Sequence, residues 1–369
     1  AAVLLAVCGA VLMLVSRSGS RLSPREGCVT VALAWIIMSV FGALPFYLCG
    51  AIPSYINAFF ETVSGFSTTG ATILNDVECV PRAVLLWRST TNWIGGMGVL
   101  VFLLAIVPFS QEGGSMFLLR AEFPGPMAVK LVPRMQKYAK LLYEMYILMT
   151  AVQTLLLVLG SVPAFDALNI SLSTVSTGGF SIKNDSLISY SRYAQTVTLV
   201  FMTLCSMSFS LFYCLIIKEY VRIRKNRELR LFVIIVVLCS LLIGVRSAQG
   251  FVSFGDGLHH TLFQVISIIS TTCYTSISAT FWPPFVWSVL IVLMITGPMA
   301  GSTGGGMKLS RVMILAKSTY RALVTTITPG RVQPIRADGE AVDEDTVSSV
   351  NSFAVAYLFA IVLTAVVLS

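Results

Sequence analysis

Charged residues are scarce in this sequence. Only 11% of its 369 residues are Asp, Glu, Lys or Arg and 56% are hydrophobic, whereas a soluble domain carries roughly 25% charged residues. The mean hydropathy of +0.84 is too high for one buried core, because even large soluble domains keep most polar side chains on a wetted surface. The composition therefore excludes an ordinary soluble protein and predicts an integral membrane protein.

Residues that carry metal or covalent chemistry are scarce as well. The two histidines, His259 and His260, are adjacent, and the eight cysteines form no CxxC pair. Most of the cysteines lie inside apolar runs, where we expect them to act as small hydrophobic side chains. The sequence offers no paired carboxylates, no histidine-based nucleophile and no metal cluster at membrane depth. We therefore predict that the chain is not an enzyme and binds no cofactor.

Apolar stretches close to the length of a bilayer span recur along the chain. They cover residues 28–48, 83–107, 141–162, 193–217, 231–250, 285–300 and 353–368, and residues 1–15 add a partial one. Most of the 25 basic residues lie in four segments between pairs of these stretches. The positive-inside rule places such segments in the cytoplasm, which explains the net charge of +8 without nucleic-acid binding. The pattern predicts a multi-pass protein in a lipid bilayer.

Three shorter apolar segments lie between the spans and resemble one another. NAFFETVSGFSTTGATIL, FDALNISLSTVSTGGFSI and LHHTLFQVISIISTTCYTSI each have an apolar stretch too short to span, ending in Ser/Thr-Thr and a small residue. They recur about every 100 residues in the same direction, which indicates parallel repeats about an axis along the membrane normal. The predicted fold is all-α, with a short re-entrant helix and an extended segment between the outgoing and returning spans of each repeat. The expected organisation is a partial N-terminal helix at 1–20, repeats at 21–112, 113–225 and 226–335, and the start of a fourth at 336–369.

The segment after each short helix is the candidate ion site. Non-helical backbone at membrane depth must be buried in protein or line water, and a strand whose carbonyls face an ion meets that condition. Rings of carbonyls can replace the hydration shell of K⁺, helped by the negative end of the short helix. A helix cap or turn would explain one Thr-Gly pair, but three pairs favour pore loops. The candidate ion-binding residues are Thr69, Gly70, Thr177, Gly178, Thr272 and Cys273.

Longer motifs surround these segments and cover nearly the whole chain. They are SPREGCVTVALAWIIMSVFGALPF, FFETVSGFSTTGAT, WRSTTNWIGGMGVLVF, RAEFPGP, STGGFS and GSTGGGMK. On these motifs the sequence resembles the Trk/Ktr/HKT superfamily of potassium transporters, in particular its TrkH-type membrane subunits. The resemblance implies four repeats around one central pore, each with an outer helix, a re-entrant pore helix, a filter strand and an inner helix. It also implies K⁺ as the transported ion, the cytoplasmic (inner) membrane as location, a homodimer, and gating by a cytosolic nucleotide-binding ring subunit.

Two other transport functions stay open: a sodium- or proton-coupled symporter, and a channel that discriminates poorly between K⁺ and Na⁺. A symporter needs titratable groups along its ion path, and Glu61 is the only clear candidate, so symport is less favoured. For Glu61 itself, cation attraction near the pore and a hydrogen bond that braces the filter are both open. Arg88 and Asn92 on the following span are expected to brace the neighbouring pore loop.

The glycine-rich motif GPMAGSTGGGMK needs a separate account, because Thr303 follows Thr272 too closely to begin another repeat. A phosphate-binding P-loop would require Gly-x4-Gly-Lys-Ser/Thr after a strand, which this order of residues does not give. A glycine hinge that lets helices pack closely is a second alternative. The resemblance favours a broken inner helix in the third repeat, with an intramembrane loop that acts as the gate. The predicted gating residues are Gly301, Ser302, Thr303, Gly304, Gly305, Gly306 and Lys308.

Two departures from the family pattern bear on function. Cys273 stands where family members usually carry glycine, which puts selectivity for K⁺ over Na⁺ in question. The fourth outer span begins near Ser352 and the sequence stops at Ser369. We therefore expect a fourth filter and a last inner span in a longer protein.

Overall fold

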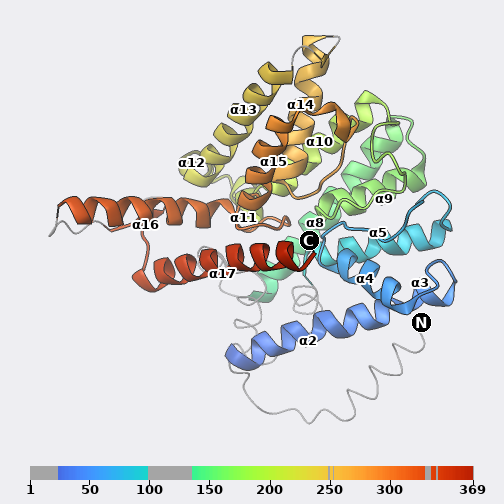
Figure 1. The fold of residues 1–369 in the computed structure, drawn as a ribbon, viewed down its shortest axis with the longest axis horizontal. Coiled ribbons are helices and arrows are strands. Elements are labelled where there is room, and N and C mark those ends of the chain that lie inside the picture. Colours follow the sequence, from blue (N-terminus) through green and yellow to red (C-terminus); the bar gives the residue numbers. More distant parts are fainter. Residues whose placement is uncertain are drawn as a thin grey trace. The chain divides into compact units, whose positions relative to one another are not determined.

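The computed structural model of the chain describes residues 24–98, 135–247, 250–251, 253–328, 334–337 and 340–368. The chain divides into two compact units, Ala1–Cys205 with Thr271–Ala279, and Ser206–Ser270 with Thr280–Ser369. The described elements are helical apart from one pair of two-residue antiparallel strands, in which Arg336 pairs with Ala341. The predicted all-α fold class is confirmed (Figure 1).

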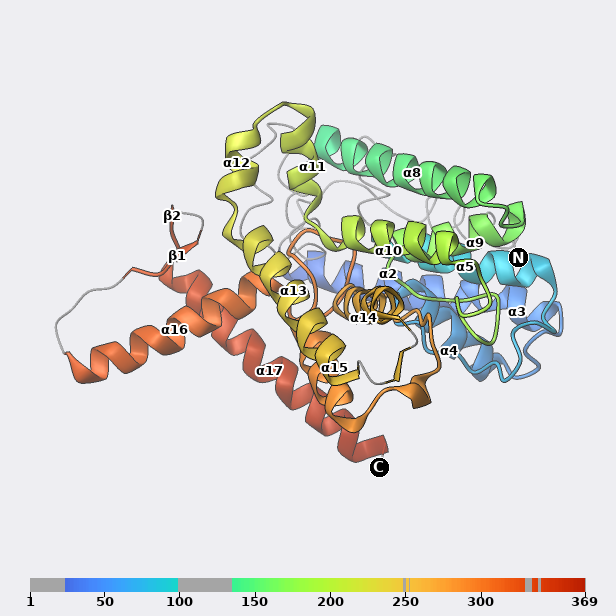
Figure 2. The same cartoon turned by 90° about the horizontal axis from the view of Figure 1, so that it is seen from above.

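The first unit contains two long outer helices and two short pore helices. Its elements are α2 (Pro24–Gly42), α3 (Leu44–Leu48), α4 (Tyr55–Phe66), α5 (Arg82–Gly96), α8 (Met135–Leu159), α9 (Ala164–Val175) and all but the last residue of α10 (Arg192–Ser206). Prolines set two of the helix starts, because Pro81 and Pro163 occupy the N-caps of α5 and α9 and a proline is poorly tolerated inside a helix. The short helix α4 packs on α2 and α5, and α9 packs on α8 and α5, as Figure 2 shows for α8. The helix α5 therefore contacts both pore helices.

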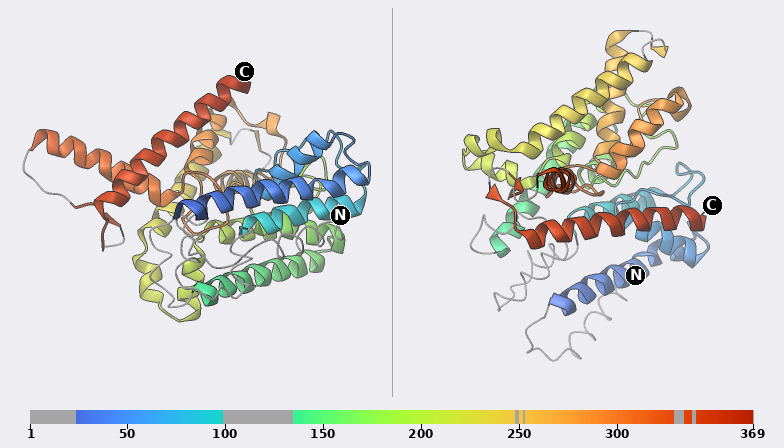
Figure 3. Two further views of the ribbon diagram at one scale, coloured as in Figure 1. Left: turned by 90° about the horizontal axis from the view of Figure 1, so that it is seen from below. Right: turned by 60° about the vertical axis from the view of Figure 1, so that its left-hand side comes forward.

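In the second unit, too, a predicted pore helix packs on the helices that precede and follow it in the chain. It contains α11 (Phe209–Ile216), α12 (Tyr220–Lys225), α13 (Arg227–Ser247), α14 (Phe254–Ile269), α15 (Pro284–Thr296), α16 (Leu309–Ile327), β1 (Arg336–Ala337), β2 (Glu340–Ala341) and α17 (Glu344–Leu368), and a short 3-10 turn at Ala279–Phe281 bridges the two units in sequence. The pore helix α14 packs on α13 and α15. Helices α16 and α17, orange and red in Figure 3, pack on each other, and their Arg321 and Glu344 side chains form an ion pair of 2.5 Å.

Four predicted spans are confirmed as helices long and apolar enough to cross a membrane. These helices cover Val29–Leu48, Lys140–Leu159, Arg227–Ser247 and Glu344–Val367. At most 39% of any of these windows is buried in the protein, as expected for helices whose apolar faces meet lipid. By contrast, the short pore helix α9 is buried without a break from Asn169 to Val175.

The remaining predicted spans differ from the expectation. The stretch at 83–107 is helical to Gly96 and described to residue 98, and its remainder, like the partial helix at 1–20, lies outside the described residues. The stretch at 285–300 is helical only over the 13 residues Pro284–Thr296, too few to cross a bilayer. The predicted span at 193–217 is not one continuous helix, because it breaks at Met207 and Ser208. Its two parts, α10 and α11, are together long and apolar enough for one span but bend by 91°, as in a broken span or a re-entrant loop.

Candidate functional site

The three pore helices end in the same backbone turn. Each helix has a serine as its C-cap, namely Ser67, Ser176 and Ser270. The residue after the cap takes a positive φ, and so does the residue two places further on. The pairs are Thr68 (φ 53°) and Gly70 (75°), Thr177 (55°) and Gly179 (73°), and Thr271 (63°) and Cys273 (61°). These turns lie where the sequence predicts the filter strands, and after that prediction we call residues 68–72, 177–181 and 271–275 the first, second and third filter segments.

This turn corrects the register expected for the second filter segment. The sequence pairs Gly178 with Gly70 and Cys273, but the caps and positive-φ residues place Gly179 in that position. Gly178 is instead the counterpart of Thr69 and Thr272. The string Ser-Thr-Gly-Gly contains two glycines, and matching the first of them to a Thr-Gly pair shifts the alignment by one residue. The expectation missed Gly179, and only the backbone conformation distinguishes it from its neighbour.

The filter segments abut one another through glycine and carbonyl groups. A Cβ atom added to Gly70 would overlap the carbonyl oxygen of Gly178, and one added to Gly179 would overlap the carbonyl oxygen of Thr272. Both positions also have a left-handed φ, which glycine adopts without steric cost. Glycine is therefore required twice over at Gly70 and Gly179, and the first segment lies beside the second, which lies beside the third.

The carbonyl that follows each of the first two positive-φ glycines is held by a hydroxyl group. The Ser64 hydroxyl donates to the Ala71 carbonyl at 2.5 Å, and the Tyr274 hydroxyl donates to the Phe180 carbonyl at 3.1 Å. The Ala71 and Phe180 carbonyls accept hydrogen bonds from protein hydroxyl groups, so they are not free to face an ion. Only the carbonyls that precede them are candidates for that role. The candidate stretches of the three segments contain the predicted residues Thr69, Gly70, Thr177, Gly178, Thr272 and Cys273, together with Gly179.

A buried ion pair lies behind the first filter segment. The Arg88 Nε on α5 donates to the Glu61 carboxylate on α4 at 2.6 Å, and the two side chains are 3% and 0% exposed. Asn92, one turn further along α5, is also buried and its amide packs on the Cα of Gly178. Arg88 and Asn92 both contact the second filter segment, Arg88 at the Ser181 carbonyl and Asn92 at Gly178, as expected of side chains that brace a neighbouring pore loop.

The loops beyond the first two filter segments are tied together by side-chain hydrogen bonds. The Asn184 amide donates to Asp76 at 2.8 Å, and its oxygen accepts from the Val77 amide at 2.9 Å. The Cys79 thiol donates to the same Asp76 carboxylate at 2.9 Å. The hydrogen bonds from Cys79 and Asn184 lower the pKa of Asp76, because they stabilise its charged form. These contacts hold the two loops in one register at all but acidic pH.

The glycine-rich motif is a loop between two helices. Helix α15 ends at Thr296 and α16 begins at Leu309, and the residues between them, which we call the 297–308 loop, include positive φ values at Gly297, Gly301, Gly306 and Lys308. A continuous helix with a glycine hinge is therefore wrong. The helix before the loop also excludes the strand that a P-loop requires.

Two sets of contacts fix the 297–308 loop within the second unit. The Lys308 ammonium donates to the Gly304 carbonyl and, at 3.3 Å, to the carbonyl and hydroxyl of Ser302. A Cβ atom at Gly304 would lie 2.7 Å from the carbonyl oxygen of Ser270, the residue that caps α14 immediately before the third filter segment. The loop thus lies against the C-terminal end of the third pore helix.

Sequence reasoning missed two further contacts of this loop. The Ser206 carbonyl accepts from the Met299 amide at 3.1 Å, and the Phe209 amide donates to the Gly301 carbonyl at 2.9 Å. The buried Glu228 carboxylate, at the start of α13, accepts from the amides of Ala300 at 2.8 Å and Ser310 at 3.0 Å. The only signal for Glu228 in the sequence is an acid at the edge of an apolar span.

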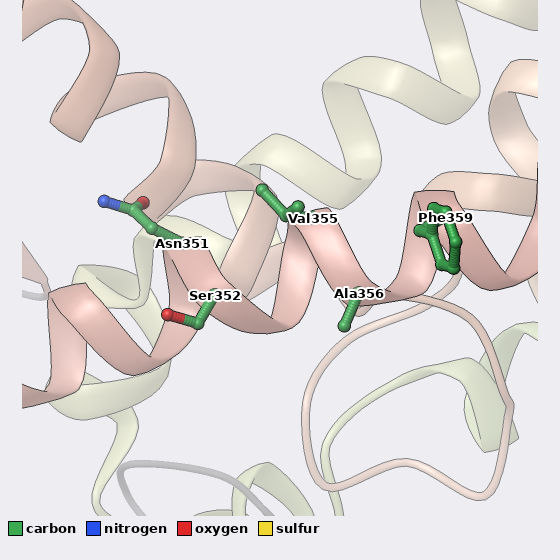
Figure 4. A pocket seen from close by; sticks show the side chains of 5 residues that line it. All are labelled: Asn351, Ser352, Val355, Ala356 and Phe359. Carbon is green, nitrogen blue, oxygen red and sulfur yellow. The ribbon is translucent and has the colours of Figure 1, made fainter.

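The described residues offer little for covalent or metal chemistry. Among them no group of three or more His, Cys, Asp or Glu side chains could hold a metal ion. A groove on α17 is lined by side chains from that single helix, and its polar groups are Asn351 and Ser352 (Figure 4). This groove adds no group that could act on an ion at the filter segments.

Comparisons with known proteins agree with this geometry. The TrkH family, described as cation transport protein, matches residues 1–369. The Trk system potassium uptake protein TrkH of Salmonella typhimurium is 34% identical over 357 residues, which are 94% of this chain and 73% of that protein. The TrkG protein of the Escherichia coli Trk system is 31% identical, over 91% of this chain and 70% of its own length. The crystal structure of the potassium transporter TrkH from Vibrio parahaemolyticus matches with a TM-score of 0.86 at 31% identity, covering 98% of this chain and 75% of that one.

Proposed function

Because the chain belongs to the TrkH family of cation transport proteins, we propose that it takes up potassium ions across the cytoplasmic membrane. One observation carries the proposal. Three successive filter segments follow buried pore helices, and each of the first two places a glycine against the carbonyl of the next. Backbone packed that closely presents carbonyls as a group, which is the arrangement that replaces the hydration shell of K⁺.

The ion path runs along the carbonyls that precede Ala71 and Phe180 and along those of Thr271, Thr272 and Cys273. Dehydration by these carbonyls gives selectivity, and the C-terminal ends of α4, α9 and α14 add negative dipole ends nearby. The membrane potential drives uptake, supplying about 2.3 kcal/mol per elementary charge for each 100 mV. No cofactor or covalent step is needed for this transport.

The 297–308 loop is the gate of this path. Its position against Ser270, at the base of the third filter segment, supports this role. Four positive-φ residues and the Lys308 contacts hold it in one shape, while its flanking helices α15 and α16 are regular. A homodimer and a cytosolic nucleotide-binding ring subunit that moves the loop complete the proposal.

Coupled symport is the alternative within transport, and the two buried acids argue against it. Glu61 is paired with Arg88, and the Glu228 carboxylate accepts from two backbone amides. Protonation of either acid would remove the negative charge that strengthens these bonds, and at Glu61 it would leave the buried Arg88 charge unpaired, so neither acid is suited to carry protons through a transport cycle.

The test is flux into proteoliposomes that contain the full-length protein. With a K⁺ gradient alone, and without a Na⁺ or proton gradient, we expect K⁺ uptake that follows the membrane potential. Replacing K⁺ by Na⁺ is expected to reduce the uptake. Flux that stops when the Na⁺ and proton gradients are abolished would refute the uncoupled pathway and favour symport.

A further inference from the structure

We propose that the Glu61–Arg88 pair is a strap that sets the spacing between the first and second filter segments, and so determines selectivity. The inference rests on the proposed K⁺ transport and assigns specificity to two side chains that lie behind the ion path. Their bonds reach residues at corresponding places in two repeats, Thr72 in the first and Ser181 in the second.

Glu61 holds the first filter segment. Its carboxylate accepts from the Thr72 hydroxyl at 3.0 and 3.1 Å and from the Ile73 amide at 2.9 Å. The donors are the last residue of the segment and the residue that follows it, two and three places beyond Gly70. With Arg88 Nε as a further donor at 2.6 Å, both oxygens of the carboxylate are occupied.

Arg88 holds the second filter segment. Its Nη1 donates to the Ser181 carbonyl at 2.6 Å, and its guanidinium lies 3.6 Å from the centre of the Phe180 ring. Ser181 is two places beyond Gly179, as Thr72 is two places beyond Gly70. One guanidinium and one carboxylate therefore connect equivalent positions of adjacent segments.

The third filter segment is also hydrogen-bonded to the second, next to the Arg88 contact. Tyr274 is buried, and its hydroxyl donates to the Phe180 carbonyl at 3.1 Å. The second segment thus receives Arg88 at Ser181 and Tyr274 at Phe180. A shift of the second segment would have to break bonds to both neighbouring repeats.

The charges suit a strap better than an ion-attracting group. A buried carboxylate that is already paired at 2.6 Å and takes two more donors has little field left for a passing cation. The fork of the guanidinium permits one side chain to bond two acceptors and to stack on a ring. A lysine at this place would keep the charge but could not make the same set of contacts.

The experiment measures the K⁺/Na⁺ permeability ratio from reversal potentials of the full-length protein in bilayers. We expect Arg88→Lys to lower the ratio about tenfold, which corresponds to about 1.4 kcal/mol. Arg82→Lys is the matched control, because Arg82 lies at the exposed start of the same helix and is expected to leave the ratio within about twofold. A wild-type protein that passes no K⁺ would refute the proposed function, whereas a selective wild type with an equally selective Arg88→Lys variant overturns the strap alone.

A double variant separates positioning from charge balance. Glu61→Gln with Arg88→Met removes both charges, so no buried charge is left unpaired and the protein is expected to reach normal amounts in the membrane. The ratio is still expected to be low, because Ser181 and Phe180 have lost their partner. A ratio restored to the wild-type value would overturn the strap, as would a Glu61→Gln variant that loses K⁺ flux at low K⁺ with its ratio intact. Should either Arg88 variant fail to accumulate, Tyr274→Phe tests the same point and is expected to lower the ratio without lowering the amount of protein.

Discussion

Replacing Cys273 by glycine is expected to increase the K⁺/Na⁺ permeability ratio. Cys273 has a φ of 61°, close to the 75° of Gly70 and the 73° of Gly179. The cysteine therefore takes the left-handed conformation of its glycine counterparts and not the extended conformation of a regular strand. The third filter segment keeps the shape of the other two, but at a conformational cost that glycine would not incur.

The size of the effect follows from that cost. A left-handed conformation costs an L-residue roughly 1–2 kcal/mol. With cysteine at 273, this cost reduces by about that amount the free-energy gap between the native backbone of the third segment and its competing conformations. Glycine at this place would also gain freedom in the unfolded chain, worth about 0.5–1 kcal/mol against folding, so global stability is expected to change little. Selectivity compares two ions in the same folded protein, and the unfolded-state contribution cancels. A shift of about 1 kcal/mol corresponds to a roughly fivefold rise in the ratio.

The assay is the reversal potential under mixed K⁺ and Na⁺, with Cys273→Ala as the matched control. Alanine keeps the Cβ atom and its steric cost but removes the thiol, so the ratio of this variant is expected to equal that of the wild type. Two results would refute the reasoning. One is an unchanged ratio in Cys273→Gly, and the other is an equal rise in Cys273→Ala, which would assign the effect to the thiol.

Three other variants test the remaining elements of the site. Gly179→Ala is expected to reduce K⁺ flux more than tenfold, because its Cβ atom would overlap the Thr272 carbonyl; normal flux would contradict the packing of the filter segments. Gly301→Ala is expected to alter the open probability with an unchanged K⁺/Na⁺ ratio, since Gly301 has a φ of 74° and lies against Ser208, and a changed ratio in single-channel records would contradict its place in the gate. Glu228→Ala removes the acceptor of the Ala300 amide in the loop and of the Ser310 amide at the start of α16, at about 1–3 kcal/mol each, so it is expected to increase flux in the absence of a cytosolic regulator; unaltered regulation would argue against a role of Glu228 in holding the loop.

The outer and pore helices could be predicted from the sequence because their signals are local. Long apolar runs identify the spans that contain α2, α8, α13 and α17, and short runs before a Ser-Thr pair identify α4, α9 and α14. The break after α15 could be predicted as well, because four glycines at 301 and 304–306 disfavour a helix. In each case the residues that decide the structure lie within the element itself.

The register of the second filter segment is a different problem. Gly178 and Gly179 are adjacent glycines just after Thr177, so the sequence alone does not show which of them corresponds to Gly70 in the first segment. What separates them is the neighbour each one meets: Gly179 lies against the Thr272 carbonyl, whereas Gly178 lies against the Asn92 amide. These partners come from another repeat and another helix, so a single repeat carries no information about the choice.

The break between α10 and α11 shows most directly why the rest could not be predicted. Residues 193–217 contain no charged side chain, and no proline or glycine interrupts them. In a continuous helix the Ser206 carbonyl and the Phe209 amide would bond within the helix, but here they bond Met299 and Gly301 of the 297–308 loop. The 297–308 loop and the break between α10 and α11 therefore supply hydrogen-bond partners for each other's backbone groups. Without the other, each would leave backbone groups unpaired at membrane depth, which is costly. The helix therefore breaks where a distant loop supplies the missing partners, and the same two hydrogen bonds connect the second inner helix to the proposed gate.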